Sequence, residues 1–425
     1  MENLEPIAKK LFDEIPQSTW SGKDLLEIEG EIQKIINQLG NKVIGEYILP
    51  SRVEEIEGKP KRCECGRDYE VQKKRVQKKI LGQYGSMVLS RTQYYCEACN
   101  KYPTIADDEL GLINHRVSPR IALMSGLCGA SWPYEVSEAF MEFFLGIEIS
   151  HETIRRITTN EKLQPKPLSS DPLDNPPGVV GMDGILIRGK EKDQWLEMKV
   201  GSFFSNVVEV SEKRREVLDA SFVGGSMEKW EDFEGRVTVE AFRRGLDCTE
   251  EVEFVSDGAE GIWSLQETVF PNAKMRLDLY HAKKKIGERT KEGFRDDPLK
   301  RKHKDLLLGH LEKGEVMEAV GYLEKHMPVD DEKKKSIKRL VRYMKRHESH
   351  IPNYIEVKEE GGTVSSGLVE KGNDLVVAAR MKDDKMHWTR QGADPIILHR
   401  TNFINQHARN RTGPYAVAFC SNLNQ

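Results

Sequence analysis

Hydrophobic spacing divides the chain into helical and strand-like stretches. In residues 1–48 apolar side chains recur at the three- and four-residue spacing of a helix, as at Leu25, Ile28, Ile32 and Ile35. This pattern predicts a helical N-terminal region. Its apolar stripe packs either on the next domain or on a second subunit, and the sequence leaves both open.

The pattern changes twice before residue 178. Strand-like residues with turn glycines follow in KKILGQYGSMVLSRTQYY. Helical spacing then returns: PYEVSEAFMEFFLG predicts one amphipathic helix, IEIS a turn, and HETIRRITTNEKL a second helix capped by Ser150. The proline-rich segment LQPKPLSSDPLDNPPG predicts a semi-rigid linker.

From residue 178 strands and helices alternate. VVGMDGILIRG, WLEMKVGSFFSN and REVLDASFVG predict three strands, and MEKWEDFEGRVTVEAFRRG predicts a helix. VEFVSDG, EGIWSLQETVF and AKMRLDLYH continue as strand, helix and strand. Residues 282–350 are helical and basic, and GLVEKGNDLVVAARMK is the last helix before an arginine-rich tail without clear pattern. This order predicts an α/β domain of the ribonuclease-H-like kind, interrupted by a helical insertion before its final helix.

Composition limits the class of protein. The chain has 425 residues, of which 38% are hydrophobic and 32% charged, which is typical of a soluble multidomain protein. It contains no apolar run near the roughly 18 residues of a membrane helix, so we expect no membrane partner. The charged start MENLEPIAKKLFDEI is not a secretory signal, and a cytoplasmic location is expected.

Charge is distributed unevenly along the chain. The net charge is −4, yet residues 61–92 hold nine Lys and Arg against three Asp and Glu, and residues 281–350 hold twenty against thirteen. A basic segment is either a solvated face or a contact for phosphate groups. Two such segments in an otherwise acidic chain suggest local contact with nucleic acid.

Four of the seven cysteines form two pairs, Cys63/Cys65 and Cys96/Cys99. Four thiolates suffice for a closed tetrahedral site, so we expect one structural Zn²⁺. The alternative is a set of unrelated free thiols, because the single residue between the first two cysteines is tighter than usual. The three remaining cysteines are isolated and are expected to be ordinary core or surface residues.

Three carboxylates are the candidate catalytic residues. Asp183 interrupts an apolar strand, Asp257 ends a later strand, and Glu370 lies on the last helix. A buried carboxylate needs a partner or a metal, and three of them can hold two Mg²⁺ or Mn²⁺ ions for phosphoryl transfer. With 69 acidic residues in the chain, each one alone has an ordinary explanation. Asp374, one helical turn beyond Glu370, is the rival third ligand.

A resemblance adds to this picture. VVGMDGILIR, SDGAEGIWSLQETVFPNAKMRLDLYHAKK and VSSGLVEKGNDLVVAARMKDDKMHWTRQGADPIILHR resemble the three blocks of DDE transposases of bacterial insertion sequences. The chain is most similar to the IS-Kra type, distantly to Mutator-like transposases, over roughly residues 178–405 and more loosely over 60–160. The chain departs from the family after Glu370, where it has Lys371, Gly372, Asn373 and Asp374.

The resemblance implies a set of roles and modules. Asp183, Asp257 and Glu370 would be metal ligands, and Asp278 and His281 match a position near the active site. The implied domains are a helical N-terminal region at 1–58, a zinc-ribbon-like module at 59–112, helix-turn-helix-like DNA-binding helices at 113–163, a linker at 164–177, a ribonuclease-H-like catalytic domain at 178–281 and 356–405, its basic helical insertion at 282–355, and a C-terminal tail at 406–425.

Candidate DNA contacts lie in both halves. Arg155 and Arg156 sit on the predicted recognition helix, where they could reach phosphates or base edges, although two adjacent helices often only pack together. His281 and the lysines of the insertion are candidate phosphate contacts. Those lysines are Lys283, Lys284 and Lys285.

The function expected from these features is a transposase that cuts and joins DNA strands with divalent metal ions. Its partners would be double-stranded DNA, as element terminal repeats and as target, and other copies of itself on that DNA, which implies a nucleoid-associated location. The alternatives are a catalytically impaired or domesticated DNA-binding protein, which the departure after Glu370 favours, and a ribonuclease-H-like nuclease without strand transfer.

Overall fold

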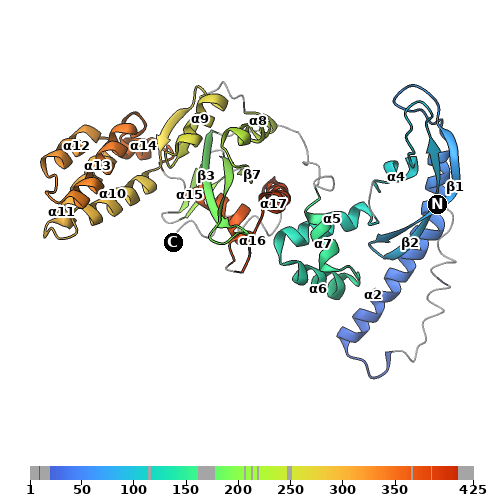
Figure 1. Cartoon of the computed structure of the whole chain (residues 1–425). Coiled ribbons are helices and arrows are strands. Elements are labelled where there is room, and N and C mark those ends of the chain that lie inside the picture. Colours follow the sequence, from blue (N-terminus) through green and yellow to red (C-terminus); the bar gives the residue numbers. More distant parts are fainter. Residues whose placement is uncertain are drawn as a thin grey trace. The chain divides into compact units, whose positions relative to one another are not determined.

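The computed structural model describes residues 9, 20–112, 116–160, 178–204, 207–211, 214–217, 220–246, 251–364, 367–383 and 385–409. The chain divides into two compact units, residues 1–164 and 165–425 (Figure 1). The predicted proline-rich linker at 164–177, Cys248, and residues 410–425, which include Cys420 and most of the predicted C-terminal tail, lie outside the described residues. No helix in the described ranges is long and apolar enough to cross a membrane.

The first unit opens with the predicted helices. α2 (Leu25–Lys42) begins at a capping box made by Asp24 and Glu27, continues through a π-helical segment (Val43–Ile48) and passes into α3 (Leu49–Glu57). None of the α2 side chains is fully buried. The helix is attached by polar contacts: Asn37 Nδ2 donates to the carbonyl oxygen of Leu145 and Asn41 Nδ2 to that of Ser86.

A long antiparallel hairpin follows, of β1 (Glu70–Gly82) and β2 (Gly85–Tyr95). Its inner face packs on α3 and on the short helix α4 (Ile105–Glu109) through a small apolar core. Asp107 accepts hydrogen bonds from Lys78 and Arg91, one from each strand, so the polar groups inside the hairpin are paired. The pairing is irregular between Val71 and Val76, where the strand bulges.

Three short helices complete the first unit. They are α5 (Pro119–Ser131), α6 (Tyr134–Leu145) and α7 (His151–Thr158), packed around a core of their own. The predicted Ser150 cap is confirmed, because its side chain accepts from the Thr153 N–H. The predicted second helix is shorter than expected, since α7 ends at Thr158.

The second unit is built on a mixed five-stranded sheet. The strand order is β7-β4-β3-β8-β9. The first three strands along the chain, β3 (Val179–Arg188), β4 (Trp195–Phe204) and β7 (Ser221–Gly225), pair antiparallel, and β8 (Glu253–Ser256) and β9 (Lys274–Leu277) add in parallel. The third predicted strand is divided, because β6 (Arg214–Val217) pairs with β5 (Val207–Ser211) in a separate hairpin.

Alternation along β3 decides which side chains face which layer. Val180 and Met182 belong to the large core that also holds residues of α8 (Glu234–Arg243) and α9 (Glu260–Val269). The odd-numbered positions face the opposite side. There Gly181 lies against Val369 of α15 (Gly367–Asn373), and a Cβ at Gly181 would be 2.2 Å from Val369 Cγ2. α15 therefore packs directly on the central strand.

The predicted last helix is confirmed, with an internal irregularity. α15 passes into a π-helical segment (Asp374–Ala378) and then α16 (Ala379–Met381). The apolar run after Glu370 anchors it, since Val376 and Val377 are fully buried.

The prediction of an unpatterned tail after this helix was wrong. α17 (Arg390–Arg409) packs against β7. Ala393, Ile396, Ile397 and Ile404 are buried at helical spacing, and Asn405 bonds the backbone of Phe222. Pro395 and the interspersed polar residues masked this stripe, because proline inside a helix normally signals its end.

The predicted basic insertion is helical and forms a bundle beside the sheet (Figure 1). It consists of α10 (Leu279–Gly293), α11 (Lys300–Glu312), α12 (Val316–Lys325) and α13 (Asp331–Arg346), followed by α14 (Tyr354–Glu359). Tyr354 is fully buried and its hydroxyl donates to the Leu277 carbonyl oxygen at 2.6 Å, which ties the return of the chain to β9.

Candidate carboxylate and cysteine sites

Strand register brings the first two carboxylates together. Met182 of β3 is paired in parallel with Ser256 of β8. One residue further along each strand, Asp183 and Asp257 therefore emerge side by side. The Gly184 N–H donates to Asp183 Oδ1 at 2.8 Å, and the Ala259 N–H donates to Asp257 Oδ1 at 2.9 Å. Both carboxylates are half-buried and held by the backbone that follows them.

Glu370 joins this pair from α15. Burial raises the pKa of Asp183 to about 6, with the negative charges of Asp257 and Glu370 contributing to this increase. Burial also raises the pKa of Glu370, and the neighbouring charges of Asp278 and Asp374 act in the same direction. Asp257 at a neighbouring strand end and Glu370 on a helix thus both lie close enough to disfavour ionisation of Asp183 on the central strand.

His281 lies between Glu370 and Asp278. Its Nε2 lies 3.9 Å from Glu370 Oε1, and its Nδ1 lies 3.2 Å from Asp278 Oδ1. Asp278 is completely buried and caps α10 by accepting the His281 N–H. The ion pair with Asp278 raises the pKa of His281, and Asp183 and Asp257 add to the effect. The resemblance-based expectation that Asp278 and His281 lie near the carboxylates agrees with this geometry.

Three neighbours of the site were not predicted. Asn373 Nδ2 donates to Asp183 Oδ2 at 2.8 Å. His347 and Tyr343, at the end of α13, lie on the Asp257 side, where a Cβ at Gly258 would be 2.8 Å from His347 Cε1. Burial lowers the pKa of His347 to about 4, so this ring is neutral near pH 7. Helical spacing from Glu370 could have indicated Asn373, but no local signal links α13 to Asp257.

The carboxylate arrangement is open. In contrast to the cysteines below, these carboxylates are not among the described groups whose ligand atoms all lie within 4.8 Å of one another. A two-ion site needs a wider arrangement, because the ions are themselves about 4 Å apart and each ligand oxygen lies about 2 Å from its ion. The oxygen-rich donor set and the mutual repulsion of the acids fit hard divalent cations.

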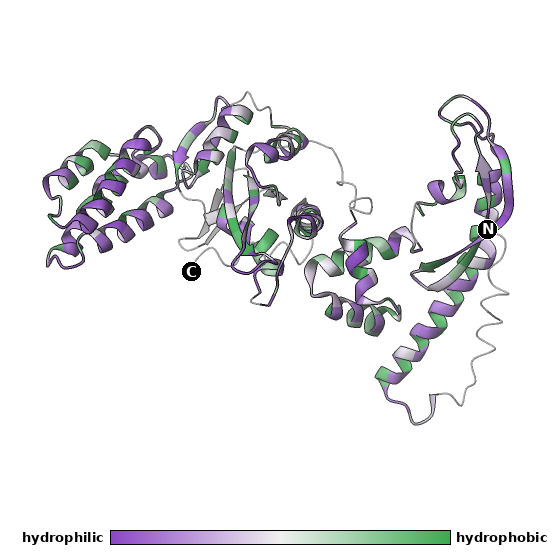
Figure 2. Cartoon of the chain, viewed as in Figure 1, coloured by the Kyte–Doolittle hydropathy of each residue, from purple (hydrophilic) through white to green (hydrophobic). Residues whose placement is uncertain are grey.

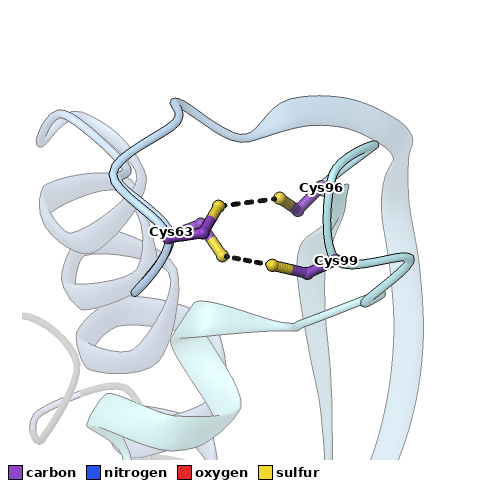
Figure 3. A group of neighbouring side chains, drawn as sticks. Cys63, Cys96 and Cys99 are labelled. Carbon is purple, nitrogen blue, oxygen red and sulfur yellow. Dashed lines mark hydrogen bonds between the residues drawn. The ribbon is translucent and has the colours of Figure 1, made fainter.

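The cysteine site is closed. The four sulfur atoms of Cys63, Cys65, Cys96 and Cys99 all lie within 4.8 Å of one another. The Cys63–Cys99 and Cys65–Cys96 sulfur distances are 3.8 and 3.6 Å (Figure 3). A tetrahedral ion with Zn–S bonds of about 2.3 Å would require sulfur separations of about 3.8 Å. The cluster could therefore bind a metal such as zinc.

Two similar turns build this cluster. Each cysteine pair is followed by a residue with left-handed backbone, Gly66 at φ 87° and Asn100 at φ 50°. In the first turn, the Gly66 N–H donates to the Cys63 carbonyl oxygen at 2.8 Å. The tight spacing of the first pair is thus accommodated by a glycine that tolerates positive φ.

The thiols of this cluster affect one another's ionisation. The Cys65 backbone N–H and the Tyr69 hydroxyl lower the pKa of Cys63 to about 6. Interactions with Cys65 and Cys63 raise the pKa of Cys99 to about 12. The first thiolate thus opposes ionisation of its neighbours, and a bound metal ion would remove this conflict.

The predicted DNA-binding residues lie in different electrostatic settings. Arg155 is exposed but paired with Glu152 at 2.7 Å, and the Arg156 guanidinium donates to Thr153. Lys283 is paired with Glu312. Lys284 is exposed, and its charge lowers the pKa of Glu370, so it faces the carboxylate site.

A run of exposed cationic side chains lies on β1. Lys73, Lys74, Arg75 and Lys79 are exposed, and the structure gives none of them an ion pair within the described residues. The bulge at this point puts Arg75 at φ 57° and turns consecutive basic side chains outward. Hydrophilic residues line much of β1 in Figure 2. We call these four residues the basic ribbon.

A protein-family model matches part of the chain. The model of an uncharacterised protein family (UPF0236) matches residues 211–412, a stretch that includes Asp257, Glu370 and α17 but not Asp183. A search of curated proteins found no match.

Proposed function

We propose that this protein is a DDE-type transposase whose catalytic domain has a ribonuclease-H-like fold. The observation that carries the proposal is the meeting of Asp183, Asp257 and Glu370 across β3, β8 and α15. The sheet supports it, since three antiparallel strands and two added in parallel, in the order β7-β4-β3-β8-β9, give a central strand whose Asp183 faces α15.

In this proposal the three carboxylates hold two Mg²⁺ or Mn²⁺ ions. When bound, the ions activate the attacking oxygen and stabilise the leaving oxygen of a phosphodiester. Asp183 is kept in one orientation by the Gly184 N–H on one oxygen and Asn373 on the other. His281 and Lys284 place positive charge beside Glu370, where the phosphates of the cut strand would lie.

Double-stranded DNA would be the substrate, at the ends of the element and at the target. The basic ribbon and the exposed face of α7 belong to the first unit, which supports DNA binding outside the catalytic domain. Strand transfer at two ends requires at least two active sites, so we expect copies of the chain to assemble on DNA. The module around Cys63 and Cys96 would carry a structural Zn²⁺.

Of the two acidic residues near the end of α15, Glu370 is the better third ligand. Its Oε1 lies 3.9 Å from His281 Nε2, and its charge is one of those that raise the pKa of Asp183. Asp374 is exposed, begins the π-helical segment and acts on Glu370 rather than on Asp183.

The test is a cleavage and strand-transfer assay on DNA carrying the native element ends, with Mg²⁺. Asp183→Asn, Asp257→Asn and Glu370→Gln should each bind these ends and fail to cut them, whereas Asp374→Asn should remain active. Activity in Glu370→Gln with loss in Asp374→Asn would move the third ligand to Asp374. End binding without cleavage by the wild type would favour the inactive DNA-binding alternative, to which the departure after Glu370 points.

A further inference from the structure

Only one of the two polar atoms of the Asn373 carboxamide has a hydrogen-bond partner among the described residues. The side chain is 5% exposed, and its Nδ2 donates to Asp183 Oδ2 at 2.8 Å. Its Oδ1 is buried and accepts no hydrogen bond from any described residue. An unsatisfied buried polar atom costs about 1–3 kcal/mol, and such atoms in native proteins commonly face a water molecule or an ion.

Packing fixes this carboxamide in place. A Cβ at Gly372, the preceding residue, would be 2.7 Å from Ser202 Oγ, so α15 packs closely on β4 here as well as on β3 at Gly181. Reversing the amide would set Oδ1 against Asp183 Oδ2, two acceptors without a proton between them. The orientation with Oδ1 free is therefore the favourable one.

The free oxygen has the chemistry of a magnesium ligand. Amide and carboxylate oxygens are the donors that hard divalent cations take, and Mg²⁺ usually keeps several of its waters. Asn373 Oδ1 belongs to the same carboxamide that contacts Asp183, so it lies at the edge of the carboxylate site. No described residue donates to it, so its partner would be a water molecule, a cation or a cation-bound water.

We propose that Asn373 is a ligand of the metal ion held by Asp183, through Oδ1 and either directly or by way of one ion-bound water. Its Nδ2 at the same time holds the second carboxylate oxygen of Asp183. This inference rests on the proposed function. It assigns a role to one of the residues at which the chain departs from the transposase family, and the departure then becomes part of the site.

The experiment measures Mn²⁺ affinity in the full-length, zinc-loaded protein without DNA, by electron paramagnetic resonance at pH 8. Asn373→Leu has similar size and neither amide atom, and should weaken Mn²⁺ binding about 10-fold or more, as loss of supporting metal-site residues typically does. Asn373→Asp restores an oxygen without the N–H donor and should bind Mn²⁺ at least as tightly as the wild type.

Asn353→Ala is the matched control. Asn353 is half-buried and caps α14 by accepting the Ile355 N–H, so its loss removes the amide of an asparagine that lies outside the carboxylate site. This variant should lose stability of similar size and keep its Mn²⁺ affinity. Thermal unfolding of the metal-free proteins checks that all variants are folded, and Asn373→Ala replaces Asn373→Leu if the latter does not fold.

The outcomes separate the inference from the proposed function. Asn373→Leu within two-fold of wild-type affinity would overturn the inference, while loss of binding in Asp183→Asn would still support the carboxylate site. Equal weakening by Asn373→Leu and Asn373→Asp would also overturn it, because only the N–H donor would then matter. Absence of Mn²⁺ binding in the wild type would instead overturn the proposed function.

Discussion

The cysteine cluster and the carboxylate cluster are both sets of anionic side chains held close together, but the cysteine cluster is closed and the carboxylate cluster is open. The four sulfur atoms are gathered within 4.8 Å by two tight turns, which leaves room for one ion and nothing else. The carboxylates come from two strands and a helix, and are spread more widely beside His281. A closed site suits a structural ion, and an open one leaves positions for a substrate.

The largest effect should come from opening the closed site. Replacing Cys96 and Cys99 with Ser should abolish zinc binding and loosen residues 60–104, because a structural zinc site contributes about 10 kcal/mol or more of apparent binding energy. Metal content by mass spectrometry and limited proteolysis would follow the change. Residues 178–409 should keep their protease resistance, and freshly purified wild type without stoichiometric zinc would refute this prediction.

The next effect concerns catalysis in the open site. Replacing any of the three carboxylates by its amide should reduce cleavage at least about 1,000-fold, since removal of one electrostatic group from an active site commonly has effects of 10²–10³ and a metal ligand should have more. End binding measured by mobility shift should remain. A variant that loses both binding and cleavage would indicate a structural role for that residue.

Acidity provides a third contrast. The pKa of Asp183 is raised to about 6, above the ordinary value of 3.8, so its charged form is disfavoured in the folded protein. In the metal-free protein, burial of the Asp183 carboxyl group does not lower the free energy of unfolding below about pH 4, where the group is protonated in both states. The free energy of unfolding falls as the pH rises to about 6, because the unfolded state then loses this proton more easily than the folded state. Asp183→Asn should therefore stabilise the metal-free protein by on the order of 2–3 kcal/mol at pH 7.5.

Urea unfolding at two pH values checks this sign. The free energy of unfolding of metal-free Asp183→Asn should exceed that of the wild type at pH 7.5 and equal it at pH 4. Mn²⁺ should remove this difference at pH 7.5, because the ion stabilises only the protein with the intact carboxylate. A variant that is less stable than the metal-free wild type at pH 7.5 would contradict the account of Asp183.

The smallest effects should be on DNA affinity. Neutralising Lys73, Lys74 and Arg75 of the basic ribbon with Gln should weaken binding to all DNA about equally and reduce the slope of log Kd against log salt by about one unit per lost phosphate contact. Neutralising Lys283, Lys284 and Lys285 should act in the same way. An unchanged slope in both variants would assign phosphate binding to another surface.

Sequence recognition should behave differently from phosphate binding. Changing Arg155 or Arg156 of α7 should cost more on element ends than on random DNA, by about 1–3 kcal/mol if the side chain reads a base. Because Arg155 is already paired with Glu152, Arg156 should have the larger effect of the two. Equal losses on both kinds of DNA would make α7 a phosphate contact.

Sequence reasoning predicted what depends on local pattern. The apolar run interrupted by Asp183, the Ser150 cap and the cysteine spacing each carry their meaning within a few residues, and the strands, helix and cluster appeared where expected. α17 was missed because its stripe of buried residues is broken by Pro395 and polar side chains that bond within the fold, as Arg400 does to the Leu375 carbonyl oxygen.

Long-range contacts explain the remaining failures. In the sequence, Asn373 is an ordinary residue of a helix. Its contact with Asp183 depends on the close packing of α15 at Gly181 and Gly372. His347 and Tyr343 reach Asp257 only because the insertion folds back on β9 and the loop after β8. Helical spacing from Glu370 marks Asn373 as a neighbour of the site but does not predict its contact with Asp183, and no period or motif links α13 to Asp257.

The most direct test of both sites is an anomalous-scattering map from crystals of the full-length protein grown with Mn²⁺. We expect a zinc peak among Cys63, Cys65, Cys96 and Cys99. We also expect two manganese peaks about 4 Å apart among Asp183, Asp257 and Glu370. A zinc peak with no manganese at the carboxylates, under conditions where DNA carrying the element ends is also bound, would contradict the proposal that this protein cuts DNA with metal ions.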